Sequence, residues 1–152
     1  NVATPLVCDL LDDVPEIRSM LVMVQREVAE RFAAPPGSKQ YGAVSVKVAY
    51  WASASVAGLV PASVFVPRPN VESALVRIDR REPPRADRAL LFSLVRTAFN
   101  QRRKMLRRSL SGVVPPEVFE AAGVSPEERP APLGLDAWVR LADAAAAAGV
   151  SA

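Results

Sequence analysis

Residues 64–78, V-F-V-P-R-P-N-V-E-S-A-L-V-R-I, combine a stiff loop with the strand that follows it. Pro67 and Pro69 fix their own φ and keep the preceding residue out of the helical region, so the loop is extended and rigid. Phe65 stands at the entry of this loop. An aromatic ring held there could stack on a flat ligand, or it could be an ordinary core residue, since most phenylalanines are buried.

The second half of the stretch alternates between apolar and charged positions. Ala74, Val76 and Ile78 fall on one face, and Arg77 and Asp79 fall on the other. This period of two predicts a strand with one buried face.

The segments before this loop predict a helix, a strand and a second helix. Thr4 as the N-cap with Pro5 at the first helical position predicts a helix start. The apolar run 20–24 predicts a strand buried on both faces, and residues 26–34 predict a helix that stops at Pro35. This order is typical of the latter part of a doubly wound α/β domain. Residues 55–60 predict another strand.

The segment after residue 82 predicts helices. Glu82-Pro83-Pro84 marks a boundary, and further helices are expected at 115–122 and 135–148 around a proline-rich stretch at 125–133. The apolar face expected for the first of these helices is formed by Leu91, Leu94, Val95, Ala98 and Phe99.

A basic cluster lies in this second part. No acidic residue occurs between Arg88 and Pro116, and positions 96, 100, 103 and 107 are spaced three or four apart, which predicts a continuous positive helical surface. Phosphate binding is the natural use of such a surface, and a solvated helix face is the alternative. The basic residues are Arg88, Arg96, Arg102, Arg103, Lys104, Arg107 and Arg108.

Composition limits the chemistry. The 152 residues include one cysteine and no histidine, which excludes intrachain disulfides, cysteine-based zinc sites and histidine-dependent triads. No apolar run reaches the roughly 18 residues that a membrane span needs. We expect a cytoplasmic protein without a metal, and we expect a fragment, because Asn1 replaces an initiating methionine.

Four segments together resemble the adenine-N6 dimethyltransferases of small-subunit (16S) ribosomal RNA, the KsgA family. The loop F-x-P-x-P-x-V-x-S-A at 65–74 resembles the loop that stacks the target base in that family. The other matching segments, in the family's order, are Thr4-Pro5-Leu6, Q-R-E-V-A-E-R at 25–31 with G-S-K-Q-Y-G at 37–42, and F-N-Q-R-R-K at 99–104.

The resemblance implies a division of the chain. Residues 1–82 would be the latter half of a Rossmann-like class I methyltransferase domain, and residues 83–152 a small all-helical RNA-docking domain. It also implies a helix at 42–52, where the alternation of Val44, Val46, Val48 and Tyr50 by itself favours a strand.

The resemblance also implies roles for individual residues. Phe65 would stack the target adenine. The residues expected to contact RNA are Arg102, Arg103, Lys104, Arg107 and Lys39. If four or five of these groups met phosphates, log K would fall with log salt at a slope of about −3 to −5. Glu27 and Arg31 are expected to form an (i, i+4) helix pair.

The activity implied is methyl transfer from S-adenosylmethionine to two adjacent adenosines near the 3′ end of 16S rRNA. The partner would be the assembling small ribosomal subunit, and the protein a monomer. No G-x-G pattern follows a strand, so no cofactor-binding residue is assigned here. We expect the cofactor to bind to a preceding amino-terminal half and this fragment alone to be inactive.

Three alternatives stay open. One is an Erm-type large-subunit rRNA methyltransferase, although the motif at 100–104 fits the small-subunit family better. The second is a non-catalytic nucleic-acid-binding relative. The third is an α/β domain with a basic helical tail and no role in RNA binding.

Overall fold

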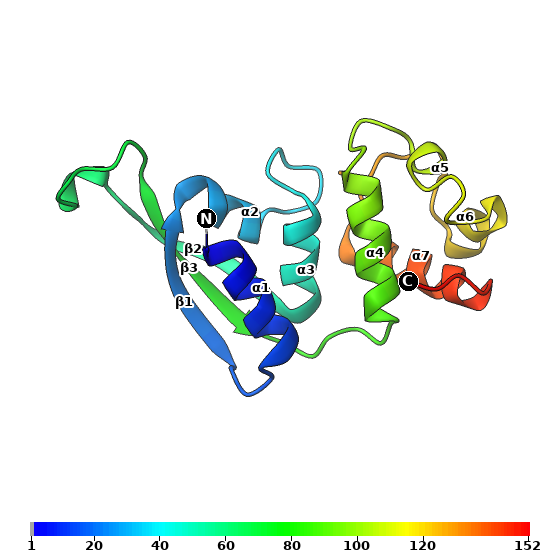
Figure 1. Cartoon of the computed structure of the whole chain (residues 1–152), viewed down its shortest axis with the longest axis horizontal. Helices are drawn as coiled ribbons and strands as arrows, with labels where there is room; N and C mark the ends of the chain where they lie inside the picture. Colours follow the sequence, from blue (N-terminus) through cyan, green and yellow to red (C-terminus); the bar gives the residue numbers. More distant parts are fainter. Residues whose placement is uncertain (1) are drawn as a thin grey trace.

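Three antiparallel strands form a sheet with the order β1-β3-β2 in the computed structural model, which describes residues 2–152 (Figure 1). The strands are β1 (Ser19–Gln25), β2 (Ala52–Val60) and β3 (Ser73–Arg80). Central β3 is antiparallel to both neighbours, so β1 and β2 run parallel and end at the same edge. The predicted alternation in β3 is confirmed, because Ala74, Val76 and Ile78 are fully buried.

Three helices cover one face of this sheet (Figure 1). They are α1 (Ala3–Asp13), α2 (Arg26–Ala33) and α3 (Ala43–Trp51). A hydrophobic cluster joins them to the sheet, and its members include Val7, Leu11, Val28, Phe32, Val48, Val76 and Ile78.

The expectation that the 20–24 strand is buried on both faces is wrong. In β1, Leu21 is 64% exposed and Met23 is 52% exposed, whereas Val24 is buried. The exposure of Leu21 and Met23 follows from the position of β1 in the sheet. Within residues 2–152, β1 is an edge strand, and its Leu21 face lies on the side of the sheet opposite the three helices.

The predicted capping role of Thr4 is also wrong, because α1 begins at Ala3 with Val2 as its N-cap, two residues earlier than predicted. Pro5 is tolerated inside the first turn, where the backbone N–H groups have no intrahelical acceptor.

The segment 42–52 is a helix, as the resemblance implied. Its apolar alternation arises because α3 is buried on two sides. Val46 and Tyr50 pack into the cluster shared with the later helices, whereas Val44, Val48 and Trp51 pack toward the sheet, with Trp51 reaching both clusters. A helix between two layers therefore mimics the period of a strand.

The rest of the chain forms α4 (Arg88–Phe99), α5 (Leu106–Ser109), α6 (Pro116–Ala122) and α7 (Leu135–Ala147). The Asp87 carboxylate caps α4 by accepting a hydrogen bond from the Leu90 N–H at 3.1 Å. The expected apolar face of α4 is confirmed at Leu91, Leu94, Val95 and Ala98, which are buried, whereas Phe99 is half-buried.

A second hydrophobic cluster links these helices to the α/β part. It contains Trp138 and Leu141 of α7 together with Tyr41, Val46 and Tyr50, which precede residue 82. The division into two domains at residue 82 stays a prediction, and α3 contributes to both clusters.

Candidate nucleic-acid interface

The loop that carries Phe65 joins the carboxyl end of β2 to β3 and projects beyond the edge of the sheet (Figure 1). It opens with a short 3-10 helix, η1 (Ala62–Val64), and the Phe65 N–H donates to the Ala62 carbonyl at 3.2 Å. Phe65 is half-buried and belongs to neither hydrophobic cluster, while the adjacent Val66 is 98% exposed. The interpretation of Phe65 as an ordinary core residue is therefore not supported.

A polar groove of about 650 Å³ runs along the base of this loop. Arg26 crosses it, with its guanidinium donating to Glu30 at 2.9 Å and to Glu72 at 3.2 Å. The two residues are also joined through the backbone, because the Arg26 N–H donates to the Glu72 carbonyl at 3.0 Å. Arg26 thus ties the end of the Phe65 loop to α2. Sequence analysis missed this link, since the two residues are 46 positions apart and no local pattern joins them.

The basic residues do not lie on one continuous helix, so the predicted helical stripe is wrong. α4 ends at Phe99, a turn spans 100–105, and α5 begins at Leu106. The turn is held by carbonyls from a remote segment. The Leu106 N–H donates to Glu128 at 2.7 Å and the Arg107 N–H donates to Pro126 at 2.9 Å.

This turn leaves most of the predicted RNA-binding side chains in solvent. Arg103, Lys104 and Arg107 are exposed. Arg129 comes from the same remote segment, and its Nε donates to the Arg103 carbonyl at 2.8 Å. Another cation therefore lies beside the cluster. We define Arg103, Lys104 and Arg107 as the basic turn.

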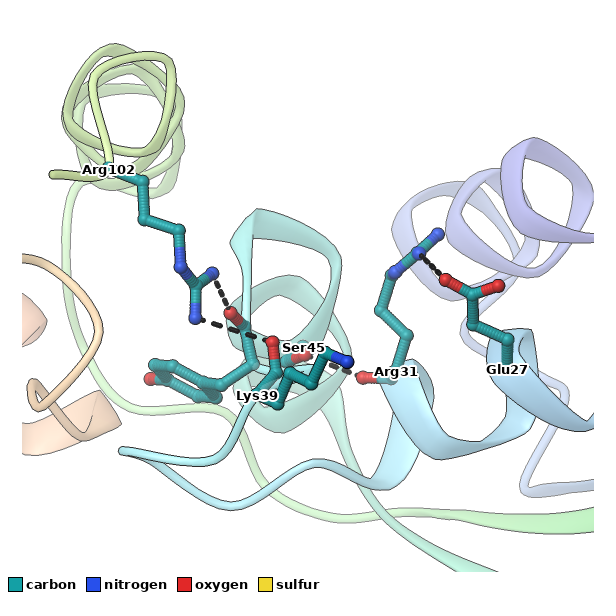
Figure 2. A network of polar contacts seen from close by, with 6 residues as sticks. Glu27, Arg31, Lys39, Ser45 and Arg102 are labelled. Atoms are coloured by element: carbon teal, nitrogen blue, oxygen red, sulfur yellow. Dashed lines mark hydrogen bonds and ion pairs between the residues drawn. The ribbon is translucent and has the colours of Figure 1, made fainter.

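Arg102 behaves differently from its neighbours (Figure 2). Its guanidinium is directed at the loop 38–41, where it donates to the carbonyls of Tyr41, Ser38 and Lys39. The group also lies over the Phe99 ring, with Cζ 5.5 Å from the centroid. Lys39 itself is exposed, and the structure gives its Nζ no partner within residues 2–152.

One other expectation concerns the neighbouring helix α2. The Glu27–Arg31 pair is confirmed at 3.3 Å, and both side chains lie at the surface of α2 (Figure 2).

No structural role was predicted for Ser45. Its hydroxyl donates to the Arg31 carbonyl at 2.5 Å and accepts from the Gly42 N–H at 3.1 Å, which fixes the start of α3 against α2.

The side chains described so far include no reactive nucleophile. Cys8 is buried, and burial raises the pKa of its thiol, which keeps it protonated and unreactive. In the described part of the chain, histidine, cysteine and carboxylate side chains form no group of three that could hold a metal. Across residues 2–152, no helix has the length and apolar character needed to cross a bilayer.

Comparison with solved structures shows the same fold in two other proteins. A dimethyladenosine transferase from Plasmodium falciparum matches with a TM-score of 0.85 at 21% identity, over 98% of this chain and 64% of that one. The 23S rRNA methyltransferase ErmE matches with a TM-score of 0.68 at 24% identity, over 94% of this chain and 61% of that one.

Sequence relatives are closer. The protein named ribosomal RNA small subunit methyltransferase A of Acidothermus cellulolyticus is 48% identical over 151 residues, 95% of this chain and 52% of the relative. Its namesake in Kineococcus radiotolerans is 48% identical over 149 residues, 93% of this chain and 50% of that relative. The chain thus spans about half the length of these curated relatives. The family model for ribosomal RNA adenine dimethylase matches residues 1–146. The chain therefore belongs to the ribosomal RNA adenine dimethylase family.

Proposed function

We propose that this chain is the substrate-facing part of an S-adenosylmethionine-dependent rRNA adenine N6,N6-dimethyltransferase. Its substrate is two adjacent adenosines near the 3′ end of 16S rRNA in the assembling small subunit. The observation that carries the proposal is Phe65, an aromatic side chain outside both hydrophobic clusters at the carboxyl edge of the sheet. The family and the names of the relatives support the reaction class.

The chemistry requires an exposed aromatic surface at this position. The N6 amine of adenine is a weak nucleophile, because its lone pair is delocalised into the ring. The base must therefore leave its stack and be held with the amine aimed at the methyl group. An aromatic face replaces the lost stacking and contributes about 1–3 kcal/mol per base. Catalysis by positioning needs no histidine, which agrees with the composition.

The residues present do not form a site for the methyl donor. No G-x-G turn follows a strand. The acidic side chains at the groove beside the loop are engaged by arginines, Glu30 and Glu72 by Arg26 and Glu27 by Arg31. We assign S-adenosylmethionine, which supplies the methyl group, to a further part of the protein. The free backbone edge of β1 is where a Rossmann-like half would continue the sheet, and the exposed Leu21 face is where its helices would pack. On this proposal the chain alone is inactive.

The basic turn and Lys39 dock the RNA. Four lysine or arginine side chains that displace counterions from phosphates give a slope of log K against log salt of about −3 to −4. Such contacts position the RNA without reading its sequence.

The test measures transfer of labelled methyl groups to unmodified small ribosomal subunits, with the full-length protein and this chain side by side. Digestion to nucleosides then identifies the product. The proposal expects dimethyladenosine from the full-length protein and none from this chain. Salt-dependent RNA binding without any product from the full-length protein would overturn it in favour of a non-catalytic RNA-binding protein.

A further inference from the structure

Arg102 stands out from the basic residues around it, because its guanidinium is already engaged by the protein. It faces the carbonyls of the 38–41 loop, those of Tyr41, Ser38 and Lys39 (Figure 2). Its cationic face also covers the Phe99 ring. Arg103 and Lys104, the next two residues, are exposed. A charge-assisted hydrogen bond to a carbonyl is among the stronger polar contacts, so these donors are not free for phosphates.

The contacts of Arg102 join two segments about sixty positions apart. One is the turn that carries the basic side chains, and the other is the loop 37–42 that carries Lys39. The loop is also tied to the helical part by the Gly37 N–H, which donates to the Ala131 carbonyl at 2.8 Å, and by the Tyr41 hydroxyl. Arg102 contacts the backbone of Lys39 itself, because its Nη2 lies 3.5 Å from the Lys39 carbonyl oxygen.

We infer that Arg102 is a positioning residue, which holds the Lys39 loop against the basic turn so that both contact the same RNA. This rests on the proposed docking of RNA and gives the first arginine of the R-R-K motif a role different from those of the other two. The planar guanidinium can address several carbonyls and stack on Phe99 at once, whereas a lysine ammonium is a point charge that cannot do both.

Substitution by lysine separates positioning from direct phosphate contact. Arg102→Lys keeps the positive charge but removes the planar guanidinium with its several N–H donors. Arg103→Lys is the matched control one residue away. The probe is a labelled RNA hairpin with two adjacent adenosines in its loop, titrated with the 152-residue chain from about 50 to about 200 mM salt. We expect Arg102→Lys to weaken binding roughly three- to tenfold, and we expect the same from Arg102→Ala. Arg103→Lys should leave affinity and slope unchanged.

A double-mutant cycle tests whether Arg102 acts through Lys39. In the Lys39→Ala background, Arg102→Lys should have little further effect on RNA affinity. In the Arg107→Ala background, which removes one side chain of the basic turn, Arg102→Lys should instead keep its full effect on RNA affinity. A variant that merely lost stability would keep its full effect in the Lys39→Ala background, since its binding loss would not depend on Lys39.

Hydrogen exchange provides a readout that does not depend on RNA. Arg102→Lys should speed exchange of the Gly37, Tyr41 and Gly42 amides while amides in the central strand β3 stay protected. If Arg102→Lys binds RNA like the unsubstituted chain with unchanged exchange, the inference is wrong. If the unsubstituted chain itself binds RNA without salt dependence, the proposed docking fails, and exchange still reports whether Arg102 holds the loop.

Discussion

The phenol of Tyr41 donates a 2.5 Å hydrogen bond to the carbonyl oxygen of Leu133, 92 residues later in the chain. The indole Nε1 of Trp138 donates to the same oxygen at 3.2 Å. Tyr41 is 3% exposed, and its ring meets Phe99 edge-on with centroids 5.9 Å apart. The loop that carries Lys39 is therefore anchored in the core of the helical part, which couples the position of this loop to the stability of that core.

Tyr41→Phe should lower the free energy of unfolding at neutral pH by about 1 kcal/mol. The loss is modest because Leu133 keeps its bond from Trp138. Chemical unfolding monitored by circular dichroism measures it. A loss of several kcal/mol would contradict this account, since no cavity is created.

The same variant should change how the free energy of unfolding depends on pH in alkaline solution. Burial raises the pKa of Tyr41 from 10.0 to about 12. Above pH 10 the unfolded chain therefore releases this proton before the folded chain does. The unsubstituted protein should lose stability from pH 10 to about pH 12, by about 2–3 kcal/mol from this group. Tyr41→Phe removes that contribution, so the two stability curves should converge above pH 10 and cross before about pH 12. Parallel curves would contradict the assignment.

Arg80→Ala should destabilise the α/β part by about 2–3 kcal/mol. Its guanidinium satisfies carbonyls at and beyond the end of α1, namely those of Leu10, Leu11, Val14 and Ile17. Arg77→Ala on the same strand is the control, because Arg77 is exposed and its one ion-pair partner among residues 2–152 is Asp79. Urea unfolding of both variants measures the difference, and equal midpoints would mean that Arg80 contributes no more than a surface ion pair.

Phe65→Ala should reduce the rate of methylation by a full-length protein containing this chain roughly 5- to 150-fold, the loss expected for one stacking contact. Binding to the small subunit should change little, because the phosphate contacts that we propose lie elsewhere, at the basic turn and Lys39. Phe65→Tyr keeps the ring and should retain activity. Val64→Ala, at an exposed neighbour in the same loop, is the control for loop structure. An unchanged rate in Phe65→Ala would remove Phe65 from the site.

Substitution of Leu21 and Met23 by lysine should leave the stability of this chain within about 0.5 kcal/mol, because both side chains are exposed. Binding of a hydrophobic dye should fall, since an apolar patch is removed. Val24→Lys, which places a charge in the buried face of the same strand, should unfold the α/β part. An equal loss of stability from the Leu21 and Met23 substitution and from Val24→Lys would show that the Leu21 face is covered in solution.

Local sequence patterns were sufficient for most of the elements. The alternation of β3, the apolar stripe of α4 and the stop at Pro35 depend on near neighbours, and the structure confirms them. The helix α3 was different. Its period matched a strand, because two layers bury opposite sides of it, and neither layer is visible in a local window.

The candidate site divides in the same way. The sequence by itself determined which residues are aromatic, rigid or basic: Phe65 before its prolines, and an acid-free segment from Arg88 to Pro116. Only the tertiary structure decided what each side chain contacts. Arg102 turns inward while Arg103 and Lys104 face solvent, because the carbonyls of a loop some sixty residues earlier lie beside it. Composition thus sets the available charge, whereas long-range packing decides whether a charge satisfies the protein's own backbone or stays free for a ligand.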